Sequence, residues 1–337
     1  MTTEQAKKQP QNMTELFNLA RENLKAKGID RPATTVSNYQ AAAQLQRKLL
    51  DSIFMESHYL DTVEPDTGLT LFGTKLKTPV FCSALSKPGN QLSDDEMTEL
   101  VRGMGKAGAM MMLGMGGSDI LQKAIETGTP VVKIVKPYRN TDLMYEQLND
   151  AARQGCVATG MDIDHFYGSF RDGAGRMADT FAPRKAAEMR EAITAAKLPF
   201  IVKGVLSVED ARKAVEIGAS AIIVSNHIWG GFDFGVPSIM SLPKVVKAVG
   251  SKVTVLADSG FRTGNDVFKA LALGAKGVGF TTSIVSATVA CGGGGVEQLL
   301  SFVNGELKRT MAICGCAKLS SIDSSLLVLS PELKQWW

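Results

Sequence analysis

Residues 221–227 read Ala-Ile-Ile-Val-Ser-Asn-His, a short aliphatic run that ends in polar residues and a histidine. A run of β-branched residues without polar alternation is typical of a parallel strand that is buried on both faces. A second run, over residues 253–258, ends in Asp and continues as Ser-Gly-Phe-Arg. Two strands that end in polar side chains predict a functional site at the carboxyl ends of a parallel sheet, where α/β barrels carry their chemistry.

Short apolar runs of this kind alternate with segments of helical period from about residue 78 onward. Eight strands are predicted, over residues 79–84, 109–113, 130–135, 156–162, 200–203, 221–225, 253–258 and 277–281. Gly108, Gly218 and Gly274 stand at helix-to-strand turns, where a left-handed helix cap is needed. Since repeated strand–helix units join through right-handed crossovers, and eight of them close a sheet, the pattern predicts a (β/α)8 TIM barrel over residues 76–337.

The segments outside this repeat have their own predictions. Residues 1–75 form an expected N-terminal helical extension, because residues 13–27 and 41–54 carry apolar side chains at helical spacing. The polar stretch 167–179 follows the fourth strand and is a candidate lid over the strand ends. The glycines at 292–295 lack the pattern of a dinucleotide-binding loop, which favours a flexible connection.

Composition and charge exclude several classes of protein. The chain has 337 residues, is 45% hydrophobic, and carries a formal net charge of +3 without a long basic run, so no nucleic-acid partner is expected. No apolar run has the length of a membrane span, and the polar N-terminus lacks a secretory core, so we expect a cytoplasmic protein without a membrane partner. Five cysteines without zinc-ligand spacing indicate reduced thiols and no metal site.

Charged residues at the predicted strand ends are the candidate functional groups. Lys203 either stabilises an anion on a bound molecule or pairs with a carboxylate such as Asp162, and its position alone leaves both open. His227, at the end of an inner strand, suits acid–base chemistry. Residues 258–264, which include an arginine between glycines, and the threonines after the eighth strand predict a phosphate-binding site.

The order of these segments resembles the FMN-dependent 2-hydroxy acid oxidising family, which includes glycolate and lactate oxidases. The resemblance is specific from about residue 197 to 319, and its motifs are Phe-Ile-Val-Lys-Gly at 200–204, Ser-Asn-His at 225–227 and Asp-Ser-Gly-Phe-Arg-Thr-Gly at 258–264. A weaker match runs from residue 66 to the fourth strand. The resemblance implies FMN at the barrel mouth, an oxidoreductase that acts on a CH–OH group of a small-molecule substrate, and a homotetramer.

The resemblance also implies roles for the matching positions. Lys203 would stabilise the reduced flavin, His227 would take a proton from the substrate, and Asp162 would hold this histidine. The implied cofactor-binding positions are Ala84, Leu85, Ser86, Gly114, Lys133, Lys203, Ser225, Asp258, Ser259, Gly260, Arg262, Thr281 and Thr282.

The substrate-binding residues of the family are missing. Ile-Trp-Gly-Gly-Phe-Asp follows His227, so the family's arginine after the histidine is absent, and Lys133 and Val135 replace a glutamine and a tyrosine. The second arginine is not in place either, although Arg171 or Arg176 could substitute from the loop. Because those groups fix a small hydroxy acid, we expect a substrate larger or more apolar than glycolate or lactate.

Two other functions stay open. A flavin-dependent isomerase or other non-oxidative enzyme would use the same barrel without net oxidation. A catalytically degenerate flavin-binding member of the family is favoured by Thr281 and Thr282, which replace the family's glycine–arginine phosphate pair. The presence of Lys203, His227 and Asp162 favours the oxidoreductase.

Overall fold

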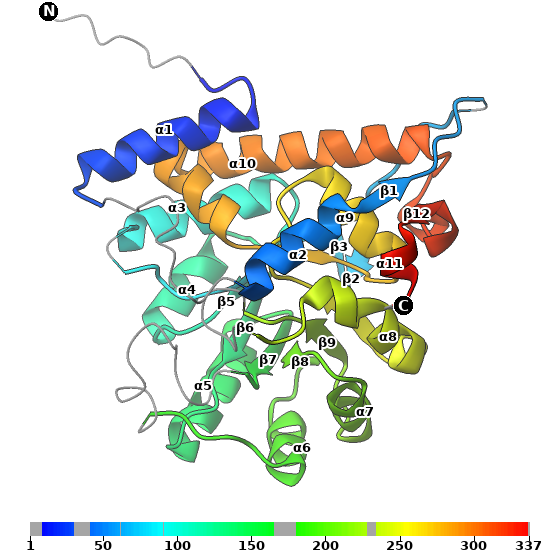
Figure 1. Ribbon diagram of the computed structural model, residues 1–337. Coiled ribbons are helices and arrows are strands. Elements are labelled where there is room, and N and C mark those ends of the chain that lie inside the picture. Colours follow the sequence, from blue (N-terminus) through cyan, green and yellow to red (C-terminus); the bar gives the residue numbers. More distant parts are fainter. Residues whose placement is uncertain are drawn as a thin grey trace, which may run out of the picture.

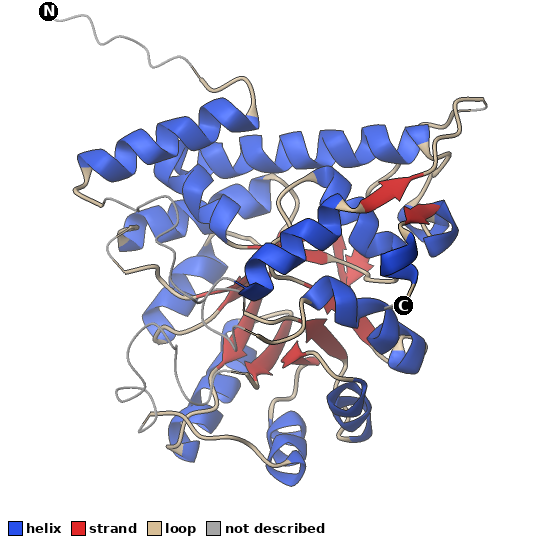
Figure 2. Cartoon of the chain, viewed as in Figure 1, coloured by secondary structure: helices blue, strands red, loops and turns tan. Residues whose placement is uncertain are grey.

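The computed structural model describes residues 9–29, 41–60, 62–89, 91–164, 180–227 and 234–335. Within them, eight parallel strands close into a barrel in the order β10-β11-β4-β5-β6-β7-β8-β9, and helices surround it (Figures 1 and 2). The predicted (β/α)8 barrel is thereby confirmed. The barrel strands are β4 (Val80–Leu85), β5 (Met110–Leu113), β6 (Val131–Val135), β7 (Ala158–Asp162), β8 (Phe200–Val205), β9 (Ala221–Val224), β10 (Thr254–Ala257) and β11 (Val278–Phe280).

Two apolar cores explain why the strands are apolar on both faces. In β5, Met110 and Met112 belong to the core inside the barrel, while Met111 and Leu113 belong to the core between strands and helices. All four side chains are buried. Side chains alternate between the faces of a strand, so a barrel covered by helices needs apolar residues at both sets of positions.

The helices between the strands begin at capping residues. Ser93 and Glu96 form a reciprocal capping box at the start of α3, and Ser207 and Thr263 cap α7 and α9. The helices of the barrel are α3 (Asp94–Lys106), α4 (Ser118–Glu126), α5 (Thr141–Gln154), α6 (Ala186–Ala195), α7 (Val208–Glu216), α8 (Ser238–Val249), α9 (Gly264–Ala272) and α10 (Thr282–Ile313).

The N-terminal part contains strands as well as helices. Helix α1 (Met13–Ala26) lies along α10 (Figure 1). Helix α2 (Ala41–Asp51) ends before β1 (Ile53–Met55), which pairs antiparallel with β12 (Leu327–Leu329), and β2 (Leu69–Leu71) pairs with β3 (Thr74–Leu76). The second predicted helix therefore ends earlier than expected, because residues 53–55 gain a strand partner from the C-terminal region, which ends in α11 (Pro331–Lys334). The division at residue 75 stays a prediction.

The glycines at 292–295 lie within α10, at and directly after a break between two helical segments, so the connection is shorter than predicted and the glycines after Gly292 are helical. The helix kinks at Cys291 and Gly292, and Gly292 has a φ of +57°. Helix α10 packs closely on α3, where a Cβ on Gly103 would overlap the carbonyl oxygen of Gly293 and a Cβ on Gly293 would lie 2.6 Å from the carbonyl oxygen of Glu99. The glycines allow this close helix packing.

Two sequence-based predictions fall on parts of the chain that the structure does not describe. The candidate lid, with Arg171 and Arg176, lies within residues 165–179, and the segment after His227 covers residues 228–233. Among the helices of the described ranges, none is both long and apolar enough to cross a membrane.

Candidate functional site

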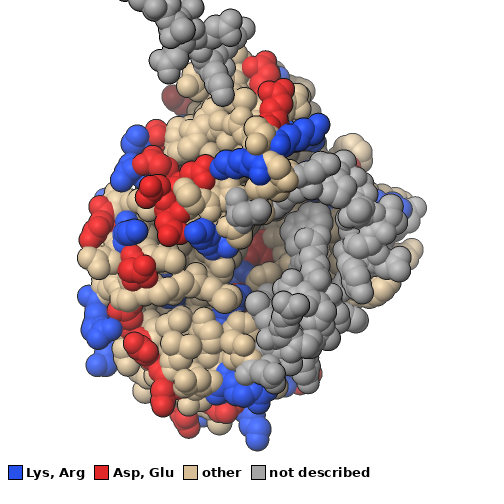
Figure 3. Space-filling view, turned by 90° about the vertical axis from the view of Figure 1, so that its left-hand side faces the viewer, with Lys and Arg blue, Asp and Glu red and all other residues tan. Residues whose placement is uncertain are grey.

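The carboxyl ends of β7 to β10 bring the charged candidate residues together. Asp162 ends β7 and is the Cα register partner of Lys203 in β8. His227 follows β9, and Asp258 follows β10, the next strand of the barrel. A space-filling view shows a hollow with acidic and basic side chains at its floor (Figure 3).

Lys203 is a buried ammonium surrounded by acceptors. Its side chain is 3% exposed, and Nζ lies 3.0 Å from Oδ1 of Asp162, 3.7 Å from Oδ2 of Asp258 and 3.4 Å from Oγ of Ser225. Burial would lower the pKa of Lys203, but the charges of Asp162 and Asp258 outweigh it and raise that pKa above its usual range. Lys203 therefore stays positively charged.

Asp162 lies between two lysines. Nζ of Lys136 is 2.5 Å from Oδ2, on the side opposite the contact with Lys203 at Oδ1. Burial would raise the pKa of Asp162, but Lys203 and Lys136 lower it well below its usual range. Lys136 was not among the predicted site residues, although it directly follows a predicted strand. The same signal, a charge at the end of an apolar run, identified Lys203.

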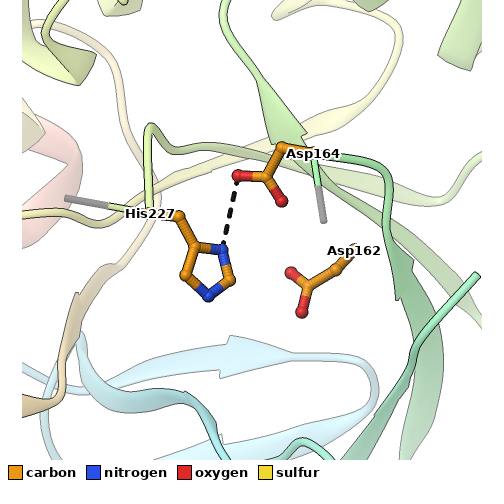
Figure 4. A group of neighbouring side chains, drawn as sticks. All are labelled: Asp162, Asp164 and His227. Carbon is orange, nitrogen blue, oxygen red and sulfur yellow. Dashed lines mark ion pairs between the residues drawn. The ribbon is translucent and has the colours of Figure 1, made fainter. Parts of the chain in front are cut away.

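The ion-pair partner of His227 is Asp164, with Nδ1 3.3 Å from Oδ2 (Figure 4). Nζ of Lys203 lies 3.2 Å from the same ring nitrogen. Asp162 also faces the imidazole, and His227 contributes, after Lys203 and Lys136, to the lowered pKa of Asp162. The sequence predicted Asp162 as the partner of this histidine, and Asp164 had no predicted role.

The backbone of His227 is in the left-handed region, with a φ of +53°. Its N–H donates to Oγ of Ser225 at 3.3 Å. A non-glycine residue at positive φ is uncommon, and such conformations concentrate at functional sites.

A metal ion does not suit this cluster. Ligand atoms of Asp162, Asp164 and His227 lie within 4.8 Å of one another. The ammonium of Lys203, however, lies 3.0 Å from Asp162 and 3.2 Å from Nδ1 of His227, where it would repel a second cation. These carboxylates, the imidazole and the ammonium can instead exchange a proton and stabilise charge.

The predicted cofactor positions at the ends of β4, β5 and β6 contact one another. Ala84 and Leu85 end β4, and the N–H of Met115 donates to Oγ of Ser86 at 2.7 Å. A Cβ on Gly114 would lie 2.6 Å from this Oγ, so a side chain at this position would have to displace Ser86. Nζ of Lys133 donates to the carbonyl oxygens of Gly114 and Gly116 at 2.7 and 3.0 Å, and burial lowers the pKa of Lys133 to about 8.

The remaining cofactor positions follow β9, β10 and β11. Asp258 accepts hydrogen bonds from Ser83 and Ser259, and Ser225 contacts Ser259. Ser259 and Gly260 both have a φ of +82°. The side chain of Arg262 is exposed.

Thr281 and Thr282 start α10 after β11. The side chain of Thr281 does not cap this helix. Because β10 and β11 are neighbours in the barrel, Arg262 and the start of α10 follow adjacent strands.

Comparisons with known proteins give a consistent picture. A family model described as FMN-dependent dehydrogenase matches residues 20–195 and 174–329. Glycolate oxidase from Spinacia oleracea is 27% identical over 353 residues, which covers 93% of this chain and 94% of that protein. L-lactate dehydrogenase from Caulobacter sp. is 48% identical over 131 residues, covering 39% of this chain and 34% of that protein. A crystal structure of mandelate oxidase is similar with a TM-score of 0.82 and 28% identity, covering 94% of this chain and 97% of that one.

Proposed function

The chain belongs to the FMN-dependent dehydrogenase family, and from this we propose that it oxidises the CH–OH group of a 2-hydroxy acid-like substrate that is larger or more apolar than lactate or glycolate. It is an FMN-dependent oxidoreductase, as its relatives are. The observation that carries the proposal is the meeting of Lys203, Asp162 and His227 at one end of the barrel.

The described residues fit FMN at both of its ends. Lys203 is a buried ammonium that would compensate negative charge on the flavin ring. The exposed guanidinium of Arg262 and the backbone N–H groups at the start of α10 would hold the phosphate. When bound, FMN supplies the electron-accepting chemistry, and the protein supplies orientation and charge.

The proposed role of His227 is to take a proton from the substrate. Its imidazole lies beside the carboxylates of Asp164 and Asp162, which would stabilise the imidazolium that forms. Lys203 is placed next to the same ring and stays charged, so it would stabilise negative charge that develops on the cofactor.

The proposal of a larger or less charged substrate rests on the contacts that Lys203 and Lys136 make with carboxylates. Lys203 and Lys136 both contact Asp162, and Lys203 also lies near Asp258, so neither ammonium group is positioned to pair with a substrate carboxylate alone. A small 2-hydroxy acid needs charge-assisted bonds to its own carboxylate. Phe234, which is 76% exposed, offers apolar surface shortly after His227 in the sequence.

A structural neighbour supports this substrate class. An arginine-to-leucine variant of mandelate oxidase was solved with 2-hydroxy-phenylacetamide, which bears an amide instead of a carboxylate, and is similar to this chain with a TM-score of 0.83 and 27% identity. For the present chain, aromatic 2-hydroxy acids and their amides are therefore the first compounds to test.

The test is the visible spectrum of the purified protein under anaerobic conditions. We expect a yellow protein that is bleached faster by (S)-mandelate or 2-hydroxy-phenylacetamide than by lactate or glycolate. Bound flavin that none of these bleaches would contradict the oxidase and favour a non-oxidative enzyme. A colourless protein that does not take up FMN would instead support a catalytically degenerate member.

Assembly and location are further proposals. We propose a homotetramer in the cytoplasm, with a mass in solution four times that of the chain. Light scattering of the holoprotein after size exclusion would test the assembly.

A further inference from the structure

We infer that Asp164 sets the tautomer of His227 and thereby keeps Nε2 of this imidazole basic. Asp164 is then a positioning residue that acts through His227, while Asp162 serves mainly as the counter-ion of two lysines. The inference rests on the proposed function, because it assigns what keeps the proposed base active.

Two groups compete for Nδ1 of His227. Nζ of Lys203 lies 3.2 Å from it, and an ammonium only donates, so this contact needs Nδ1 without a proton. Oδ2 of Asp164 lies 3.3 Å from it, and a carboxylate only accepts, so this contact needs a proton on Nδ1. A neutral imidazole satisfies only one of the two.

Only the contact with Asp164 leaves a base for the reaction. If Lys203 donates a hydrogen bond to Nδ1, the single proton of the neutral imidazole lies on Nε2, which then cannot accept another. If Nδ1 instead donates a hydrogen bond to Asp164, the proton lies on Nδ1, and Nε2 keeps the lone pair that can accept a proton from the substrate. The tautomer therefore decides whether His227 can act.

Lys203 stays an ammonium and Asp164 stays a carboxylate, so both groups always contact Nδ1 of His227 in their charged forms. Asp162 and Asp258 hold Lys203 in its charged form. Burial would raise the pKa of Asp164, but the interactions with His227, among them a hydrogen bond, and the charge of Lys203 outweigh it and lower that pKa, so Asp164 is a carboxylate. Asp162 is a weaker competitor for the proton of His227, because ammonium groups already contact both of its oxygens.

The backbone of β8 makes room for Asp164. Gly204 has a φ of +98° and lies where the pairing of β8 with β9 shifts register, between Lys203 and Val205. A Cβ on Gly204 would lie 2.6 Å from Cγ and 2.8 Å from Cβ of Asp164. The position of Asp164 thus depends on a glycine in an adjacent strand, independently of the contact with His227.

The experiment is ¹⁵N NMR of the imidazoles in the FMN-loaded protein, at a pH where His227 is neutral. The chain has three histidines, so His58→Gln and His165→Gln assign the signal of His227. We expect the proton on Nδ1 in the wild type and on Nε2 in Asp164→Ala, together with a fall in turnover of about 10²- to 10⁴-fold. Asp164→Asn, whose amide oxygen still accepts a bond, should keep part of the Nδ1–H form.

Asp150→Ala is a matched control, because its side chain is 12% exposed against 17% for Asp164 and it pairs with Arg153. It should leave the tautomer of His227 unchanged. The inference is overturned if the proton of neutral His227 lies on Nε2 in the wild type, or stays on Nδ1 in Asp164→Ala. The tautomer is read without substrate, so a normal tautomer shift in a protein that no hydroxy compound bleaches would leave this inference standing and contradict the proposed function alone.

Discussion

The ammonium of Lys136 lies 2.5 Å from Oδ2 of Asp162, and the two side chains are 6% and 0% exposed. This is a buried ion pair beside the proposed base. Burying charges is costly, and the gain from pairing them compensates only while both partners are present. Lys136 therefore fixes the charge state and the position of Asp162.

Replacing Lys136 by methionine keeps the bulk of the side chain and removes its charge. We expect Lys136→Met to lower the free energy of unfolding by about 2–4 kcal/mol, at or below the usual cost of breaking a buried pair because Lys203 still contacts Asp162. Chemical denaturation of the FMN-loaded protein measures this. Lys252→Met, at an exposed lysine, should change stability by less than about 0.5 kcal/mol. Equal effects of both substitutions would show that the pair contributes nothing.

The charge of Lys203 should raise the reduction potential of bound FMN. In Lys203→Met, the reduced anion loses its stabilising ammonium, so we expect the midpoint potential to become more negative and turnover to fall while FMN stays bound. Spectroelectrochemistry gives the potential, and the ratio of flavin to protein absorbance gives the FMN content. A potential equal to that of the wild type would reject this role for Lys203.

Burial of Lys133 predicts a pH-dependent stability. Its pKa falls from 10.5 to about 8 on folding, so between these values the unfolded chain binds more protons than the folded one. Stability should therefore rise as the pH increases through this window, by up to about 3 kcal/mol for one lysine. The bonds to the carbonyl oxygens of Gly114 and Gly116 persist with a neutral amine, which still donates.

Comparison with Lys133→Gln isolates this contribution from other titrating groups. The variant should lose the rise in unfolding free energy between pH 8 and pH 10 that the wild type shows. Parallel pH profiles of the two proteins would mean that Lys133 is charged in the folded state.

The barrel was predictable because its strands face two apolar cores. Residues such as those of β5 are buried on both sides, and such runs stand out in a sequence. The end of α2 was not predictable in the same way, because β1 becomes a strand only through pairing with β12 near the other end of the chain. Likewise, the glycines of α10 have no local pattern that indicates their contact with α3.

The site was partly predictable for a similar reason. Lys203, Asp162 and His227 end or follow apolar runs, and the parallel barrel brings such ends together. Lys136 has the same signal and was missed. Asp164 has no comparable signal, because its place beside His227 depends on the register shift in β8 and on the absence of a side chain at Gly204.

Gly204 and Gly218 form a matched pair for testing the position of Asp164. Both have a left-handed backbone, with φ values of +98° and +95°. A Cβ on Gly204 would lie 2.6 Å from Cγ of Asp164, whereas a Cβ on Gly218 would meet only Cγ2 of Ile193, at 3.8 Å. Alanine at either position carries the backbone cost of about 1–2 kcal/mol, but only Gly204→Ala must displace Asp164.

We therefore expect both variants to lose comparable backbone stability, with an additional loss for Gly204→Ala from the contact with Asp164. Turnover should fall strongly in Gly204→Ala and remain near the wild-type value in Gly218→Ala, because only the first moves the carboxylate away from Nδ1 of His227. Steady-state kinetics and thermal denaturation of the two FMN-loaded variants measure these effects. If both variants lose turnover equally, backbone strain alone accounts for the effect, and the contact between Gly204 and Asp164 has no part in holding the histidine.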